Sequence, residues 1–175
     1  GSDSVDLGGW SLQAAKSSWS TRLTFPGGTL IAPGGYLVVG DENVSFADFN
    51  LGTGETLDLG NSGSNGDGVR ILNASESIVD VVLYGPNNSD GLEMEDGSVP
   101  TDLAPKPGSG DAIGRVPNGV DTDDCASDFE SLPEPTPGIS NGEGPEECEA
   151  SGAVVVINEF LVNPAGADDG REWVE

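Results

Sequence analysis

The sequence of 175 residues contains no histidine, which removes the side chain that most often acts as a general base near neutral pH. No imidazole is present to activate a serine or cysteine nucleophile, and no H-E-x-x-H zinc motif occurs. Carboxylate pairs are frequent by composition alone, so none stands out as an acid and base pair. We therefore predict a protein that is not an enzyme and carries no catalytic cofactor.

Basic residues are also scarce, because six lysines and arginines face 31 acidic residues and the formal net charge is −25. Phosphate binding requires clustered Lys and Arg, so the sequence excludes nucleic acid as an expected partner and disfavours an anionic membrane surface. The densest apolar run is too short to span a bilayer, so no direct membrane insertion is expected. Since salt screens self-repulsion, we expect the protein to lose stability at low ionic strength.

No stretch carries a convincing apolar stripe with a period of 3.6 residues, so helices are not expected. Short apolar or alternating segments bounded by Gly, Pro, Asn and Asp predict an all-β chain instead. Their regular spacing favours a β-sandwich, and the Gly8-Gly9 pair predicts a bend. The predicted strands lie within 4–12, 18–25, 29–31, 36–40, 55–59, 68–72, 77–84 and 112–116.

Cysteine is limited to Cys125 and Cys148, which flank a Pro- and Gly-rich segment. A disulfide between them would close a loop of about 24 residues and stabilise the fold by roughly 3 kcal/mol. Both cysteines lie in polar, loop-like sequence, which favours the disulfide and an oxidising compartment. Two free buried thiols are the alternative.

The densest apolar run lies in the last segment, 153–175, which reads AVVVINEFLVNPAGADDGREWVE. Its β-branched residues predict a central strand that is apolar on both faces. We expect this segment to complete a sheet as a complementing strand, and its end at Glu175 in mid-strand suggests an opened or shared fold. The complementing residues are Val154, Val155, Val156, Ile157, Phe160, Leu161, Val162 and Trp173.

Seven segments of the chain together form one distributed pattern: VDLGGWSL at 5–12, IAPGGYLVV at 31–39, GDGVRI at 66–71, VDVVLYG at 79–85, IGRVPNG at 113–119, VINEF at 156–160 and EWVE at 172–175. This pattern resembles the lamin tail domain, an immunoglobulin-like β-sandwich that also occurs in secreted and surface proteins of bacteria and archaea. The resemblance covers nearly the whole chain, and none of its motifs is catalytic. It implies the fold and not a nuclear role, because the long heptad rod of the nuclear lamins is absent here.

The order of these segments departs from the family, because the family's first strands correspond to the C-terminal segment here. We therefore predict a sandwich lacking its first strands over 1–138, a Gly/Glu/Pro-rich linker over 139–152 and a complementing segment over 153–175. The resemblance implies a groove beside the strand that contains Val5 and Leu7. The segment fills that groove either in its own chain, as a circular permutant, or in the next copy, as a donated strand.

The predicted function is a structural subunit or tandem repeat of an extracellular surface fibre that assembles head-to-tail with other copies of itself. The alternative is an adhesive or ligand-binding module, assisted by Ca²⁺, of a larger secreted protein. Both place the protein outside the cell or on its surface.

Three weaker signals concern ligands. Oxygens that suit Ca²⁺ are supplied by Asp168, Asp169 and Glu172, and separately by Asp121, Asp123 and Asp124, although a solvated acidic loop is the default interpretation in so acidic a chain. Sequons at Asn43, Asn73 and Asn87 permit N-glycosylation, but chance also produces such triplets in a sequence rich in Asn and Ser. Trp10, Trp19 and Trp173 suit carbohydrate stacking, yet strand patterns around them favour core packing.

Overall fold

The structure of the protein is a computed structural model that describes residues 3–61, 63–142, 155–166 and 170–175. Nearly every regular element in these ranges is a short strand, which confirms the predicted all-β class. The elements are β1 (Val5–Asp6), β2 (Ser11–Ala15), β3 (Trp19–Thr24), β4 (Leu30–Ile31), β5 (Val39–Gly40), β6 (Phe49–Asn50), β7 (Asp67–Leu72), β8 (Ile78–Tyr84), β9 (Ala112–Arg115), α1 (Cys125–Asp128), β10 (Phe129–Leu132), β11 (Glu159–Leu161) and β12 (Trp173–Val174).

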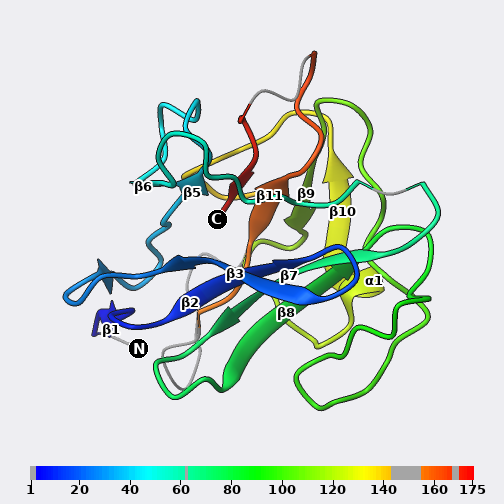
Figure 1. The fold of residues 1–175 in the computed structure, drawn as a ribbon, viewed down its shortest axis with the longest axis horizontal. Helices are drawn as coiled ribbons and strands as arrows, with labels where there is room; N and C mark the ends of the chain where they lie inside the picture. The colour runs from blue at the N-terminus through cyan, green and yellow to red at the C-terminus, as the bar shows by residue number, and fades with distance from the viewer. Residues whose placement is uncertain (1–2, 62, 143–154, 167–169) are drawn as a thin grey trace.

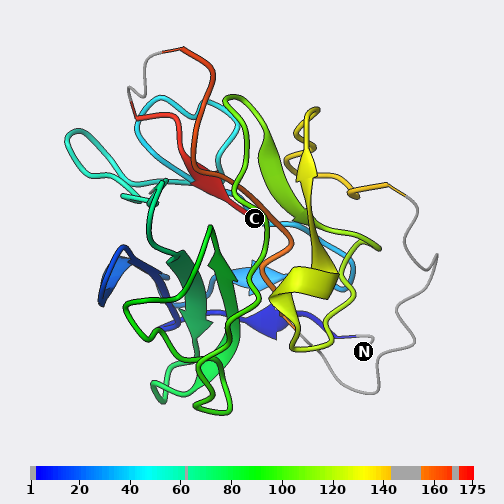
Figure 2. The same ribbon diagram turned by 90° about the vertical axis from the view of Figure 1, so that its right-hand side faces the viewer.

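Two main sheets are stacked (Figures 1 and 2). The first has four antiparallel strands in the order β3-β2-β7-β8 and consists of two hairpins. The second has six strands in the order β10-β9-β11-β12-β5-β6, of which only β5 and β6 run parallel. A two-stranded ribbon of β1 and β4 lies to one side.

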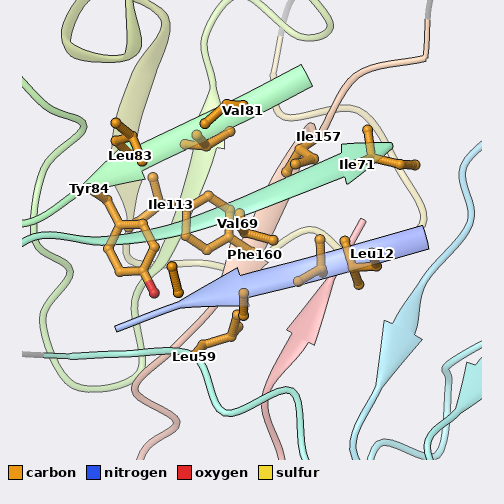
Figure 3. Packing of buried hydrophobic residues seen from close by; sticks show 14 of the residues in the cluster. Leu12, Leu59, Val69, Ile71, Val81, Leu83, Tyr84, Ile113, Ile157 and Phe160 are labelled. Carbon is orange, nitrogen blue, oxygen red and sulfur yellow. The ribbon is translucent and has the colours of Figure 1, made fainter. Parts of the chain in front are cut away.

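The core lies between the two sheets, where apolar side chains from both inner faces meet (Figure 3). Leu12 and Val69 project from the four-stranded sheet, and Ile113 and Phe160 project from the six-stranded sheet. All four are buried. This packing of two sheet faces is the immunoglobulin-like sandwich that the sequence predicts.

The Gly8-Gly9 pair forms the predicted bend between β1 and β2. Gly9 adopts a φ of 82°, a left-handed conformation that glycine reaches without steric cost. The Gly9 amide donates to the Phe25 carbonyl at 2.9 Å, which closes the turn. The bend ends β1 after two residues and lets β2 enter the four-stranded sheet.

The predicted strand over 55–59 is not formed. Leu57 and Leu59 are buried as the pattern requires, but their amides donate to carboxylates, at 2.6 Å to Asp41 Oδ1 and at 2.8 Å to Glu172 Oε2. An extended segment whose amides bond to side chains has no strand ladder. The predicted strand over 36–40 is likewise shortened to β5, Val39–Gly40.

The predicted disulfide is not supported, because Cys125 is a free, buried thiol at the start of α1. The Leu83 amide donates to its sulfur at 3.4 Å, and its sulfur lies 3.9 Å from Met94 Sδ. Burial raises the pKa of this thiol to about 12. The prediction rests on an exposed loop around Cys125, whereas α1 packs this stretch against β8 and the following β10 pairs with β9. Cys148 lies outside the described residues.

Candidate functional site

The candidate site is the groove of the six-stranded sheet that the C-terminal segment fills. β11 pairs with β9 on one side and with β12 on the other, and β12 pairs in turn with β5. Phe160 stands opposite Ile113 on β9 and opposite Val174 on β12. Residues 155–175 therefore supply the two central strands, and removing them would divide the sheet into the pairs β10-β9 and β5-β6.

Most of the predicted complementing residues are buried in this groove. Ile157, Phe160 and Val162 join the main core, and the Phe160 ring lies 5.0 Å from the Tyr84 ring between centroids. Leu161 and Trp173 belong to a smaller apolar cluster on the other face of the sheet. Val155 and Val156 are half-buried, and Val154 lies outside the described residues. A central strand buried on both faces is what the apolar run predicts.

The predicted position of the groove, beside the strand that contains Val5 and Leu7, is wrong. β1 pairs with β4 in the separate ribbon, and β11 pairs with β9 and β12. The reason is local, since the bend at Gly8-Gly9 ends β1 after two residues and leaves no edge along which a long strand could pair.

Arg115 at the end of β9 forms the charged centre of the groove wall. Its side chain is only 1% exposed, and its Nη2 lies 2.9 Å from both carboxylate oxygens of Asp80 on β8. Its Nη1 donates to Asp121 and Asp128, each at 3.1 Å. Burial alone would lower the pKa of Arg115, but the three carboxylates raise it above its ordinary value. One cation therefore holds two buried carboxylates, Asp80 and Asp128, and a third, Asp121, that is exposed.

The same ion pair binds the backbone of the C-terminal segment. Arg115 Nε donates to the Ile157 carbonyl at 2.8 Å, and the Ile157 amide donates to Asp80 Oδ2 at 2.6 Å. Burial raises the pKa of Asp80 to about 6, although Arg115 and the Ile157 amide oppose this rise. Both polar groups of the Ile157 backbone thus find charged partners on the groove wall.

The second set of polar contacts lies around Glu159 and Glu175. The fully buried Glu159 carboxylate accepts from the Thr136 amide at 2.8 Å and from its hydroxyl at 2.5 Å. Glu175 accepts from the Gly138 amide. Burial raises the pKa of Glu159, and it raises the pKa of Glu175 to about 7. Residues 136–141, at the predicted start of the linker, therefore pack against the segment.

The acidic residues proposed for Ca²⁺ have other partners in the structure. Asp121 contacts Arg115, and Asp124 caps α1 by accepting from the Ala126 and Ser127 amides at 3.1 and 3.3 Å. Glu172 is buried and accepts from Leu59, while Asp123 is exposed. Within the described ranges no group of three or more acidic, Cys or His residues is arranged to hold a metal ion. Asp168 and Asp169 lie outside these ranges.

The sequons and tryptophans occupy varied positions. Asn43 is exposed, whereas Asn73 and Asn87 are half-buried, and each of these two accepts a backbone hydrogen bond in its own turn, from Ser75 and Ser89. Trp173 is buried, and Trp10 and Trp19 are partly buried against the core, in agreement with core packing. Arg70 stacks over the Trp19 ring, 4.2 Å from its centroid. Glycosylation at these sequons stays a prediction.

A family model matches residues 1–86, the stretch that runs from β1 through β8. It describes the lamin tail domain. The lamin tail resemblance is therefore supported over this stretch, and the displaced order of the strands stays a prediction. No curated protein and no solved structure matches the chain. Among the described residues, no helix is long and apolar enough to cross a membrane.

Sequence reasoning missed the polar residues of the groove. Arg115 was predicted only as part of a strand, although a single cation within an apolar strand of an acidic protein is itself a signal for a buried ion pair. Asn158 and Glu159 interrupt the apolar run and were left out of the complementing residues. Two polar residues inside such a run indicate polar partners on the groove wall.

Proposed function

We propose that this chain is a non-enzymatic structural module that assembles with copies of itself, through a C-terminal segment of one copy that fills the groove between β9 and β5 of another. The observation that carries the proposal is the central position of β11 and β12. A sheet that lacks its two middle strands exposes unpaired backbone groups on both sides of the gap, so the groove requires an occupant. The extracellular fibre and the surface location predicted from the sequence belong to this proposal.

The contacts of the segment suit exchange between copies. They comprise the strand ladders, the apolar contacts of Ile157, Phe160 and Trp173, and the Arg115 and Asp80 contacts to the Ile157 backbone. All of these would be the same for a segment from another copy. Head-to-tail exchange of this kind propagates without closing, which gives a filament rather than a ring or a dimer. A segment in the same chain competes through its high effective concentration.

A mixing experiment tests the proposal. Phe160→Asp damages the segment and leaves the groove intact, whereas Ile113→Asp, at the position opposite Phe160, damages the groove and leaves the segment intact. Each variant alone should be poorly folded. When the two are unfolded, mixed and refolded, the intact segment of the second variant should fill the intact groove of the first. Light scattering should then detect a folded complex of two 17.8 kDa chains.

The matched control mixes Phe160→Asp with Trp173→Asp, which damages the same segment in its second strand. Both chains then have intact grooves but neither has an intact segment, so no complex should form. The wild-type protein should also gain mass as its concentration rises and form fibres visible by electron microscopy. A wild-type mass of one chain at every concentration, with no rescue in the mixture, would overturn the proposal. Retention of that monomer on a glycan or calcium column would then favour the adhesive module.

A further inference from the structure

Two polar residues lie in the middle of the apolar run that enters the groove. Residues 155–162 read VVINEFLV, and Asn158 and Glu159 are 5% and 0% exposed. Buried polar side chains within a strand are costly unless every donor and acceptor is paired. Their presence therefore depends on matching groups in the groove.

The side chain of Asn158 makes three hydrogen bonds. Its Oδ1 accepts from the Gly119 amide at 3.0 Å, and its Nδ2 donates to Asn118 Oδ1 at 3.1 Å and to Glu175 Oε1 at 3.2 Å. Its backbone carbonyl accepts from the Arg115 amide at 2.8 Å and from Asn141 Nδ2 at 3.0 Å. Residues of the groove wall thus contact both the side chain and the backbone of Asn158.

The residues that contact Asn158 are held in place by one another. Asn118 Oδ1 also accepts from the Asn141 amide at 2.9 Å, and Asn118 Nδ2 donates to the Tyr36 hydroxyl at 3.0 Å. Asn141 Oδ1 lies 2.9 Å from the Thr136 hydroxyl oxygen, which also contacts Glu159, and the single hydroxyl hydrogen is shared between these two acceptors. The groove wall therefore presents a connected set of polar groups rather than a single side chain.

A purely apolar strand in this groove would leave those groups unpaired. Leaving a buried donor or acceptor unpaired is costly, and a site built to hydrogen-bond a group discriminates strongly against an analogue that lacks it. Apolar contacts alone discriminate weakly between strands of similar volume. Selection of the occupant must therefore come from the polar groups.

From these contacts we infer that the groove is a selective recognition site for a strand with asparagine at the position of Asn158, followed by a carboxylate and flanked by apolar residues. Asn118, Gly119, Thr136 and Asn141 form the recognising wall. The occupant that fits is the segment 155–175 of this sequence, which fills the groove of its own chain in the structure, and other apolar strands are rejected. The inference rests on the proposed function only in taking residues 155–175 as the occupant.

A double-mutant cycle on the full chain tests the recognition. Asn158→Leu keeps the branched shape and removes the polar atoms, so Asn118 and Gly119 lose their partner. We expect the unfolding equilibrium constant in urea to rise about 10- to 100-fold, and Asn118→Leu to have an effect of the same order. Replacing both partners by apolar groups is far less costly than replacing one. The unfolding equilibrium constant of the double variant should therefore be at least tenfold smaller than the product of the two single effects predicts.

The matched control is Asn163→Leu, the same substitution at a half-buried position of the same segment. Its effect on the unfolding equilibrium constant should be small. When Asn163→Leu is combined with Asn118→Leu, the fold-change should equal the product of the two single fold-changes. Independent effects of Asn158→Leu and Asn118→Leu would overturn the inference, as would equal effects of Asn158→Leu and Asn163→Leu. If Asn158→Leu does not fold, recovery of folding in the double variant supports recognition, and its absence overturns it. The cycle reads the contact within one chain at dilution, so its outcome is independent of the mixing experiment.

Discussion

The four strands β3-β2-β7-β8 come from two continuous stretches of chain, 11–24 and 67–84, each of which folds back on itself. The six strands of the other sheet come from residues 39–50, 112–132, 159–161 and 173–174, and several of them are only two residues long. Local hairpins thus build one sheet, and pairing between distant segments builds the other. The second sheet therefore depends on the contacts that bring these distant segments together.

Both sheets bury carboxylates, Asp67 and Asp80 in the four-stranded sheet and Glu159 in the six-stranded sheet, but their cations differ. The four-stranded sheet carries its Arg70 at a half-buried position over Trp19, where solvent reaches the guanidinium. The six-stranded sheet buries Arg115, Asn158 and Glu159. Short strands have few ladder bonds, and the buried polar groups fix their positions instead. The groove is therefore held together by specific polar contacts in addition to apolar burial.

The largest expected effect comes from breaking the ion cluster around Arg115 of the six-stranded sheet, which includes Asp80 of the four-stranded sheet. Arg115→Met retains the apolar stem and removes the charge, which leaves Asp80 and Asp128 buried without a cation. Removing one partner of a buried pair costs about 3–5 kcal/mol. Arg70→Met in the four-stranded sheet should cost about 1 kcal/mol or less, the usual range for a partly exposed cation over an aromatic ring. Urea unfolding measures both, and equal losses would contradict the difference between the sheets.

A smaller effect concerns pH and the two glutamates of the groove. Burial raises the pKa of Glu159 and raises that of Glu175 to about 7, from its ordinary value of 4.5. A folded-state pKa above the unfolded value means that the contribution to stability is complete below about pH 4.5 and is lost as pH rises through 7. We therefore expect the free energy of unfolding to decrease from pH 5 to pH 8 through these groups.

Glu175→Gln should flatten this decrease, since the amide does not titrate. The matched control is Glu130→Gln on β10, an exposed position in the same sheet. Urea unfolding at several pH values measures the difference between each variant and the wild type. A difference for Glu175→Gln that stays constant from pH 5 to pH 8, or one that Glu130→Gln reproduces, would count against the role of burial.

The sequence predicts three strands of the four-stranded sheet well because their signals are local, whereas the predicted strand over 4–12 overlaps only the first two residues of β2. Alternation over 18–25 predicts β3, and the segments at 68–72 and 77–84 predict β7 and β8 within a residue or two. The apolar run also predicts a strand buried on both faces, and Phe160 confirms it. Each of these predictions needs only the side chains of the strand itself.

The partners in the six-stranded sheet could not be predicted in this way. The neighbours of β11 are β9 and β12, and no local pattern in 156–162 identifies them. α1 and β10 were missed because Asp124–Leu132 is polar and short, and their burial depends on β8 and β9. Leu57 and Leu59 alternate like a strand, but two distant carboxylates bind their amides. Sequence patterns give the burial of a residue more readily than its partner.

The smallest expected effect concerns the ion pairs of Asp58, the exposed counterpart of the Arg115 cluster. Asp58 contacts Lys16 and, at 2.8 Å, Arg22, and its side chain is 41% exposed. Burial alone would raise the pKa of Asp58, but the two cations lower it below its ordinary value. Asp58→Asn should cost only about 0.2–1 kcal/mol, because solvent screens such pairs. Asn also tolerates the φ of 53° at this position, so backbone strain is not added.

The cost of Asp58→Asn should shrink further between 0.1 M and 1 M salt, whereas the larger cost of Asp80→Asn in the buried cluster should change little. Equal salt dependence of the two variants, measured by urea unfolding, would show that solvent reaches both ion clusters alike.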